Sequence, residues 1–307
     1  MAIGIDALEA LGLLKSAGVE FGHVVTLGHQ QFEIRIENLA NRRSLKEYSE
    51  VVSQVRESGH GYAEPLFYEF GAQSLESIDY DDYEGCTLTH DLNEPIPKEW
   101  CQRADIVFDG GTLEHVFNFP VAIANAMNLV KKGGFFVTCT PCNNYPGHGF
   151  YQFSPELFFR LFNDANGFQV NLMVLAEAKP KGRLYGVKDP AELGHRISFS
   201  GQGALQLIMI ARRKSIAEIL KESPSQSDYS HTWQSAQSPH EQNRNQTNLL
   251  SRRIKSLIRN GLPTAWLYRY DNFLIEKRRT EESYKGINEI DSLSDGFSLF
   301  SFSSTEL

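Results

Sequence analysis

The feature that most constrains the fold of this chain is an alternation of short apolar runs with segments of helical period. β-branched and aromatic residues are enriched in the runs, and Gly, Asp or Pro bounds them, which is typical of strands. We expect strands at residues 23–27, 75–78, 86–90, 105–108, 135–139, 170–175 and 204–210, and helices at residues 121–132 and 157–162. Strands that alternate with helices build a mostly parallel sheet that is covered on both faces.

The fold class follows from this order of elements. We predict an α/β fold, doubly wound and Rossmann-like, with a mostly parallel seven-stranded sheet and an antiparallel edge strand. The last two apolar runs, 170–175 and 204–210, have no helical period between them. We therefore expect these two runs to pair antiparallel at one edge of the sheet.

The length of 307 residues exceeds what one compact domain of this kind needs. We expect four parts: an N-terminal helix at residues 1–21, a main domain at 22–213, a polar linker at 214–248 and a helical tail at 249–307. Residues 223–248 are rich in Ser, Gln, Asn and His and bury too little apolar surface to order themselves. Residues 249–279 return to a basic, partly amphipathic pattern, which predicts a helix that docks a protein partner.

Charge and hydropathy exclude several classes of protein. The formal net charge is -8 and the pI is near 5.6; this disfavours nucleic acid as a partner, because nucleic-acid surfaces cluster Lys and Arg. No apolar run approaches the roughly 20 residues of a membrane span, and Asp6 and Glu9 stand where a secretory leader would be basic. We therefore expect a cytoplasmic protein without membrane association, whose four cysteines are reduced.

One cysteine pair, Cys139-Thr140-Pro141-Cys142, has the spacing of a redox motif. A redox pair normally opens a helix, whereas this one ends an apolar run that resembles a strand. Packing roles are therefore favoured over redox or metal chemistry. The sequence has no second Cys pair and no His pair at zinc spacing, so we expect no metal site.

Four of the expected strands end at a glycine or an aspartate, namely Gly28, Asp79, Asp91 and Asp109. Ligands of open parallel sheets bind beyond the carboxyl ends of the strands, where the strand order reverses. A carboxylate after the second strand can accept two hydrogen bonds from a ribose diol. Each aspartate could instead cap a helix or make a turn, but three acids after successive strands favour a binding site.

The stretch from Ala104 to Pro141 resembles the second half of class I S-adenosylmethionine-dependent methyltransferases of the small-molecule, type 11-like group. The matching motifs are Ala104-Asp105, Leu113-Glu114-His115-Val116 and the turn Lys131-Lys132-Gly133-Gly134 before the next strand. Residues 147–155, GHGFYQFSP, also resemble this group. The resemblance spans roughly residues 22–213 and is more specific in its second half.

The resemblance implies S-adenosylmethionine as cofactor and assigns residues to it. The glycine after the first strand lets the backbone approach the methionine part, and the acid after the second strand holds the ribose hydroxyls. An acid and an apolar residue after the third strand flank the adenine, and the residues after the fourth strand lie beside the methyl group. In that order these are Gly28; Asp79; Asp91 and Leu92; and Asp109, Gly110 and Gly111.

The glycine-rich loop of this family, acid-x-Gly-x-Gly-x-Gly, is degenerate here. Residues 26–32 read TLGHQQF, so Thr26 replaces the acid and Gly28 is the single glycine left. Side chains at His29 and Gln30 would crowd the usual path of the cofactor, because the family uses glycine for close backbone approach. Either the cofactor binds in a modified pose, with hydrogen bonds from His29 or Gln30, or the domain no longer binds it.

Three residues are candidate general bases if the methyl acceptor must lose a proton: Glu114, His115 and His148. His115 could instead pack at a helix start. We predict a methyltransferase that acts on a small-molecule acceptor, for which the family suggests a sugar or another secondary metabolite. The alternative is a degenerate, non-catalytic module that binds or scaffolds a partner. A dehydrogenase would need G-x-G-x-x-G and a hydrolase G-x-S-x-G, and the sequence has neither in place.

Overall fold

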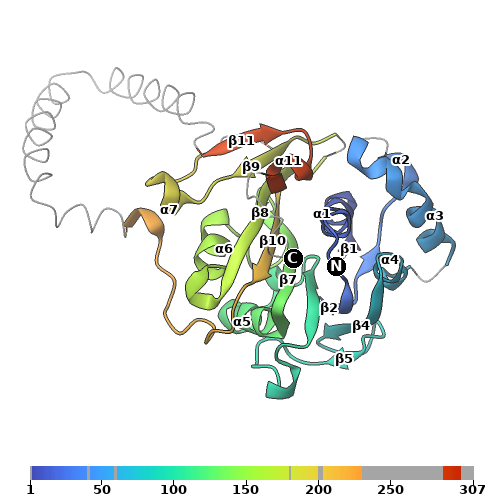
Figure 1. Cartoon of the computed structure of the whole chain (residues 1–307), viewed down its shortest axis with the longest axis horizontal. Coiled ribbons are helices and arrows are strands. Elements are labelled where there is room, and N and C mark those ends of the chain that lie inside the picture. The colour runs from blue at the N-terminus through green and yellow to red at the C-terminus, as the bar shows by residue number, and fades with distance from the viewer. Residues whose placement is uncertain are drawn as a thin grey trace, which may run out of the picture. The chain divides into compact units, whose positions relative to one another are not determined.

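The computed structural model describes residues 2–39, 42–58, 61–179, 181–199, 203–229 and 286–298 (Figure 1). The chain divides into two compact units. Of the described residues, the first unit contains those up to 187, 203–224 and 288–298, and the second contains 188–199, 225–229 and 286–287. Within the described part, every helix is too short or too polar to cross a bilayer.

A central sheet of nine strands organises the first unit, with the strand order β11-β9-β8-β10-β7-β6-β2-β4-β5. The strands are β2 (Gly22–Leu27), β4 (Ala72–Asp79), β5 (Leu88–Thr89), β6 (Ala104–Asp109), β7 (Val130–Asn143), β8 (Phe168–Glu177), β9 (Leu184–Val187), β10 (Leu205–Arg213) and β11 (Ile287–Ile290). A separate parallel pair joins β1 (Ala2–Ile3) to β3 (Gln31–Phe32).

The pairing directions confirm the predicted α/β, doubly wound and mostly parallel fold. β2 pairs in parallel with β4 on one side and with β6 on the other, β4 pairs in parallel with β5, and β6 with β7. The chain therefore runs outward from β2 in one direction and then continues on the other side of β2. This reversal of strand order creates a switch point between β2 and β6.

The last two predicted strands, β8 and β10, do form an antiparallel pair, but they do not end the sheet. β10 is inserted between β7 and β8 and runs antiparallel to both, while β9 and β11 extend the sheet beyond β8. Residues 207–211 of β10 are all fully buried. A strand that is apolar on both faces belongs inside a sheet rather than at its edge.

Helices cover both faces of the sheet. α1 (Ile5–Ser16) contacts β7 and β10 on one face, and α5 (Phe119–Leu129) contacts β6 and β7 on the other, so the two helices lie on opposite sides in Figure 1. α6 (Pro155–Leu161) lies on the α5 side, where Phe162, directly after it, stacks on Phe136 of β7 with ring centroids 5.0 Å apart. Neighbouring residues of β7 thus pack against different helices.

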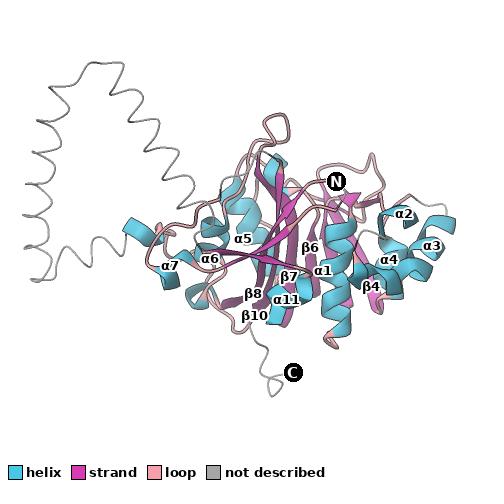
Figure 2. Cartoon of the chain, turned by 90° about the horizontal axis from the view of Figure 1, so that it is seen from above, coloured by secondary structure: helices cyan, strands magenta, loops and turns pink. Residues whose placement is uncertain are grey.

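The long connection between β2 and β4 folds into a group of short helices. It contains α2 (Ile36–Leu39), η1 (Arg43–Tyr48), α3 (Ser49–Glu57) and α4 (Glu64–Glu69). Figure 2 shows α2, α3 and α4 together beside β4. α4 contacts β4 directly, and α3 contacts α4. This helical insertion therefore lies beside β4.

The two ends of the described chain meet on the α1 face. α1 buries Asp6 and Glu9, and both carboxylates form ion pairs with Arg42, at 2.5 Å for Glu9. Burial raises the pKa of Asp6, while Arg42 opposes the shift. α11 (Leu293–Ser298) contacts α1, and the Leu293 N–H donates to Glu9 at 3.2 Å.

The predicted division into residues 1–21, 22–213, 214–248 and 249–307 stays a prediction. Residues 1–21 include β1 and α1, both in the first unit. Where a helical tail was expected, residues 287–298 form strand β11 and helix α11. Residues 230–248 of the linker and 249–285 of the helical tail lie outside the described residues.

Helix α5 ends earlier than its sequence pattern predicts. It stops at Leu129, and β7 begins at Val130. The register between β6 and β7 shifts after the pair Ala104–Val130, so residues 131–134 bulge before Phe135 pairs with Ile106. Gly133 has a φ of +88°, a backbone conformation that glycine adopts without a steric penalty. The Lys-Gly-Gly turn is therefore a bulge within a strand.

The hairpin of β8 and β9 provides a test of fold stability. The buried carboxylate of Glu177 accepts hydrogen bonds from Arg183 Nη2 at 3.0 Å and from the Arg183 N–H at 3.1 Å, and Lys179 Nζ lies 2.8 Å away. These contacts, led by those of Arg183, lower the pKa of Glu177 to about 2. Such charge-assisted bonds stabilise only the ionised carboxylate.

We expect Glu177→Gln to lower the free energy of unfolding by about 1–3 kcal/mol near neutral pH. The contribution is complete above the unfolded pKa and is lost as pH falls toward about 2. Urea unfolding at pH 7 and at about pH 3 measures this loss, with Glu192→Gln at an exposed position as the control. A difference between wild type and variant that does not shrink at the lower pH contradicts this account.

Candidate functional site

The switch point brings together the carboxyl ends of β2, β4 and β6. Leu27, the last residue of β2, lies opposite Ile78 of β4 on one side and Asp109 of β6 on the other. Gly28, Asp79 and Asp109 therefore lie along one edge of the sheet. Ligands of doubly wound sheets bind at such an edge.

Asp79 presents a half-buried carboxylate at this edge. Its Oδ2 accepts a hydrogen bond from the His29 N–H at 3.1 Å, and its Oδ1 accepts one from the Tyr80 N–H at 2.8 Å. An ionised carboxylate has about four acceptor sites, so these backbone bonds leave it able to accept further donors. Asp79 thus holds the loop after β2 through the His29 N–H and still has acceptor sites for a ligand.

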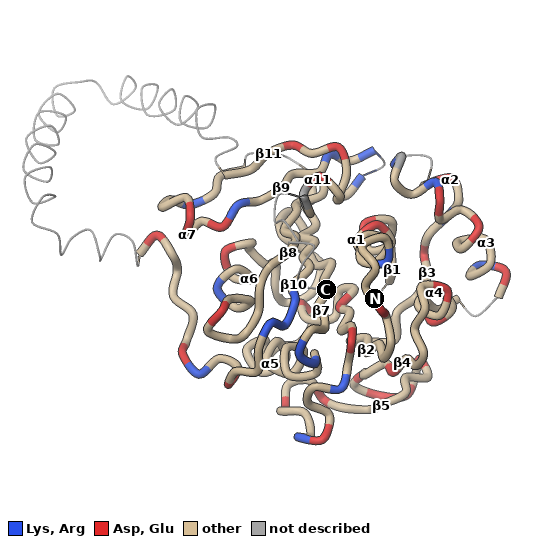
Figure 3. Tube along the Cα trace, in the orientation of Figure 1, with Lys and Arg blue, Asp and Glu red and all other residues tan. Residues whose placement is uncertain are grey.

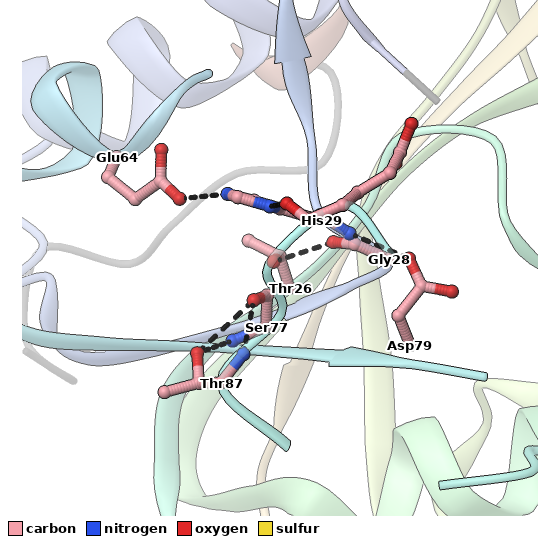
Figure 4. A network of polar contacts seen from close by, with 8 residues as sticks. Thr26, Gly28, His29, Glu64, Ser77, Asp79 and Thr87 are labelled. Atoms are coloured by element: carbon pink, nitrogen blue, oxygen red, sulfur yellow. Dashed lines mark hydrogen bonds and ion pairs between the residues drawn. The ribbon is translucent and has the colours of Figure 1, made fainter. Parts of the chain in front are cut away.

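The ring of His29 is directed away from Asp79 by its own partners (Figure 4). Its Nδ1 lies 2.6 Å from the Glu84 carbonyl oxygen, and its Nε2 contacts the Glu64 carboxylate. The ring stacks on Tyr62 with centroids 3.7 Å apart. The imidazole that was expected to crowd the loop is therefore directed toward α4, and the loop presents mainly its backbone at the edge.

Gly28 makes the turn at the end of β2. Its φ is +76°, and its N–H donates to the Ile78 carbonyl at 2.6 Å. Thr26, which stands where the family has an acid, donates from Oγ1 to the Gly28 carbonyl at 2.9 Å. A network next to it fixes the neighbouring strand: Ser77 and Thr87 exchange hydrogen bonds of 2.7 and 3.0 Å between backbone N–H and hydroxyl groups (Figure 4).

Gln30 fills the space between the ends of β2 and β6. The side chain is buried, and its Nε2 donates to the Leu27 carbonyl at 2.6 Å, which also accepts from Thr112 Oγ1 at 2.5 Å. Gln30 Oε1 is buried without a hydrogen-bond partner among the described residues. A Cβ on Gly110 would clash with this oxygen and would lie 2.8 Å from the Phe108 ring. Gly110 therefore packs closely against the side chains of Gln30 and Phe108.

Asp109 is fully buried and faces the interior of the protein. Its Oδ2 accepts from Thr138 Oγ1 at 2.7 Å, and its Oδ1 accepts from the N–H groups of Thr112 and Leu113 at 2.9 and 3.3 Å. Burial raises its pKa, although these bonds oppose the shift. These bonds hold the turn after β6, and the place beside the methyl group that the resemblance implies for this residue stays a prediction.

Asp91 and Leu92 follow β5. Asp91 Oδ1 accepts from the backbone N–H of Asn93 at 2.9 Å and from its Nδ2 at 2.7 Å, and these bonds lower the pKa of Asp91. This is the turn role that was the alternative for each aspartate. Leu92 is buried, and its carbonyl accepts from Asn125 Nδ2 at 3.3 Å.

The three candidate bases form one cluster. Glu114 and His115 lie on η3 (Leu113–His115), and His148 lies in the loop after β7. Glu114 Oε1 is 3.4 Å from His148 Nε2, and the rings of His115 and His148 are 4.9 Å apart. Both histidines are exposed, whereas Glu114 is fully buried. Gly111, with a φ of +97°, approaches so closely that a Cβ would lie 3.1 Å from Glu114 Oε1.

The environment of this cluster shifts two pKa values. Burial, and to a smaller extent the charge of Asp109, raises the pKa of Glu114 to about 8. Burial and the neighbouring His148 lower the pKa of His115. Thr140 Oγ1 donates to Glu114 Oε2 at 3.0 Å.

The partners Thr138 and Thr140 were not anticipated as site residues. They occupy alternate positions of an apolar strand and therefore point to one face. Two buried polar residues at this spacing are the sequence signal that could have identified them. Cys139 and Cys142 lie on the same strand as free thiols, and burial raises the pKa of Cys142 to about 12. Such thiols are poor nucleophiles.

No protein-family model and no curated protein sequence matches the chain. Among solved structures, a SAM-dependent methyltransferase from Aquifex aeolicus is 12% identical, covers 67% of this chain and 93% of its own, and has a TM-score of 0.35. The 1,6-didemethyltoxoflavin-N1-methyltransferase of Burkholderia thailandensis, solved with that substrate and S-adenosylhomocysteine, is 16% identical, with coverages of 67% and 77% and a TM-score of 0.35. The branched-chain polyamine synthase of Thermus thermophilus is 12% identical, with coverages of 71% and 58% and a TM-score of 0.37.

The contact between Gln30 and Gly110 is open to a direct test. We expect Gly110→Ala to lower the free energy of unfolding by about 1–3 kcal/mol, because the added methyl overpacks a filled space. Gly147→Ala, at a position with nothing within 4 Å of the new Cβ, is the matched control and should stay near wild type. Urea unfolding measures both. Equal effects of the two substitutions would show that Gln30 does not constrain Gly110.

Proposed function

We propose that this chain is an S-adenosylmethionine-dependent methyltransferase of a small-molecule acceptor. The observation that carries the proposal is the arrangement of the switch-point edge, where Gly28 and the open acceptor Asp79 lie on adjacent strands. Glu114 and His115 follow β6, which pairs with β2 on its other side, and His148 lies in the loop after β7. Ligands of doubly wound sheets bind at such a reversal of strand order.

The residues at this edge fit the cofactor in its ribose half. The carboxylate of Asp79 retains acceptor sites for a ribose diol. The His29 ring is withdrawn toward Glu64, so the loop after β2 offers backbone to the ligand. Gln30 Oε1 is a buried acceptor without a partner in the described residues, and a donor from the ligand would satisfy it. In this reading, Asp91 and Leu92 shape the adenine side through the turn that Asp91 closes.

When bound, the cofactor would supply an electrophilic methyl group on a sulfonium, open to in-line attack by an acceptor atom with the thioether as leaving group. The residues of the chain position the two reactants and manage the proton of the acceptor. Glu114, His115 and His148 are the groups that would orient the acceptor or take its proton, since both histidine rings are exposed at this edge. Asp109 is a positioning residue, because its carboxylate holds the backbone that carries Glu114.

The charge of the protein favours a small-molecule acceptor over nucleic acid. Figure 3 shows Asp and Glu distributed over the described elements and interspersed with Lys and Arg. With a formal net charge of -8, nucleic acid is a poor partner. We propose a cytoplasmic enzyme that acts on a sugar or another secondary metabolite. The protein partner expected for residues 249–279 remains a prediction outside the described residues.

A second candidate function is a non-catalytic module that keeps the fold and binds a partner. The observation that favours it is Gln30, whose side chain fills the switch point next to Gly110. A loop with a single glycine and a filled switch point leaves less room for a cofactor than a glycine-rich loop does.

Calorimetry with S-adenosylmethionine and S-adenosylhomocysteine separates the two functions. We expect binding by the wild type, and we expect Asp79→Asn to weaken it by about 1–3 kcal/mol, because a charged hydrogen-bond acceptor is lost. Asp82→Asn, at an exposed position three residues later, is the control and should bind as the wild type does. Folded protein that binds neither compound at millimolar concentration would support the non-catalytic module. Equal affinities of wild type and Asp79→Asn would overturn the role of Asp79.

A further inference from the structure

We propose that Glu114, His115 and His148 bind one divalent transition-metal ion of the zinc type. Each of the three side chains offers one ligand atom, and these atoms all lie within 4.8 Å of one another. Two imidazoles and one carboxylate around one point are a donor set that proteins use for such ions. The binding of the ion does not depend on the proposed methyl transfer.

The spacing of one pair of ligand atoms agrees with a single ion. Glu114 Oε1 and His148 Nε2 are 3.4 Å apart, and two ligands about 2.1 Å from a tetrahedral ion are separated by roughly 3.4 Å. The His115 and His148 rings, with centroids 4.9 Å apart at an angle of 65°, are tilted rather than stacked. Both rings are exposed, so a small rotation of either can complete the coordination.

The hydrogen bonding of Glu114 leaves one buried oxygen open to a ligand. Its side chain is fully buried, yet Oε1 has no hydrogen-bond partner among the described residues. A buried carboxylate oxygen without a partner is costly. His148 alone does not remove this cost, since its Nε2 approaches Oε1 without forming a hydrogen bond. A cation between the two atoms would satisfy both.

The surroundings hold the ligands in place as the outer shell of a metal site does. Thr140 Oγ1 donates to Glu114 Oε2 at 3.0 Å and thereby leaves Oε1 to face the histidines. The N–H groups of Phe150 and Tyr151 donate to the Glu114 carbonyl at 2.8 and 3.2 Å. These bonds tie the loop that carries His148 to η3, so the approach of the ligands is built into the backbone.

The donor set also selects the ion. Mg²⁺ and Ca²⁺ prefer oxygen ligands alone, whereas Zn²⁺ and its neighbours in the first transition row accept imidazole. Sites with three protein ligands keep a coordination position open for water or for an oxygen of a substrate. If the proposed function holds, this position would receive the acceptor, and the histidines would serve as ligands instead of bases.

The test uses the full-length protein, freed of metal by a chelator and titrated with Zn²⁺ alone by calorimetry. We expect one ion per chain, and we expect His115→Ala and His148→Ala each to weaken binding roughly tenfold or more. His195→Ala, which removes an exposed histidine outside the cluster, should leave the affinity unchanged. Titration with Co²⁺, followed by visible absorption, reports the coordination geometry.

Glu114→Gln tests the buried ligand, and its thermal unfolding shows whether the variant folds. If this variant folds, we expect a loss of Zn²⁺ affinity similar to that of the histidine variants. If it does not fold, the Zn²⁺ affinities of His115→Ala and His148→Ala test the proposal. Absence of Zn²⁺ binding by the wild type, or equal affinity in wild type, His115→Ala and His148→Ala, would overturn the proposal. These titrations contain no S-adenosylmethionine, so their failure is distinct from failure of the proposed methyl transfer.

Discussion

The geometry of the site depends on the buried carboxylate of Asp109. One of its oxygens accepts from Thr138 on β7, and the other accepts from the backbone of Thr112 and Leu113 at the start of η3. A carboxylate removed from water requires such partners. η3 carries Glu114 at the edge of the sheet. The position of the cluster of Glu114, His115 and His148 therefore depends on the buried side chain of Asp109.

The order of strands and helices was predictable because each element has a local periodicity of apolar residues in the sequence. The position of a strand within the sheet is not local. The apolar run that becomes β10 reads as a strand, but only its burial on both faces places it between β7 and β8. β11 is four residues long and has two exposed positions, and it joins a sheet whose other strands all precede it in the chain. Such pairings leave no pattern in a single sequence.

The rule that acids follow strands located the edge of the sheet but could not distinguish the acids from one another. Asp79 is half-buried and retains acceptor sites, Asp91 closes its own turn, and Asp109 is enclosed. Some of the partners are close in the sequence, such as Asn93 for Asp91, and others are distant, such as Thr138 for Asp109. The His29 ring is held by distant partners, namely Glu64 of the long insertion after β2 and the Glu84 carbonyl in the loop after β4. Composition and spacing identify which residues can do chemistry; neighbours decide which of them meet a ligand.

The hydrogen bond from Leu293 to Glu9 joins residues 284 positions apart. During synthesis, Leu293 leaves the ribosome 284 residues after Glu9, at about 5–20 residues per second. For roughly 15 to 60 s the acidic groups of α1 must therefore be accommodated without their last partner. The contact that closes this face forms only after residue 293 has been made, and a chain interrupted before that residue would lack it.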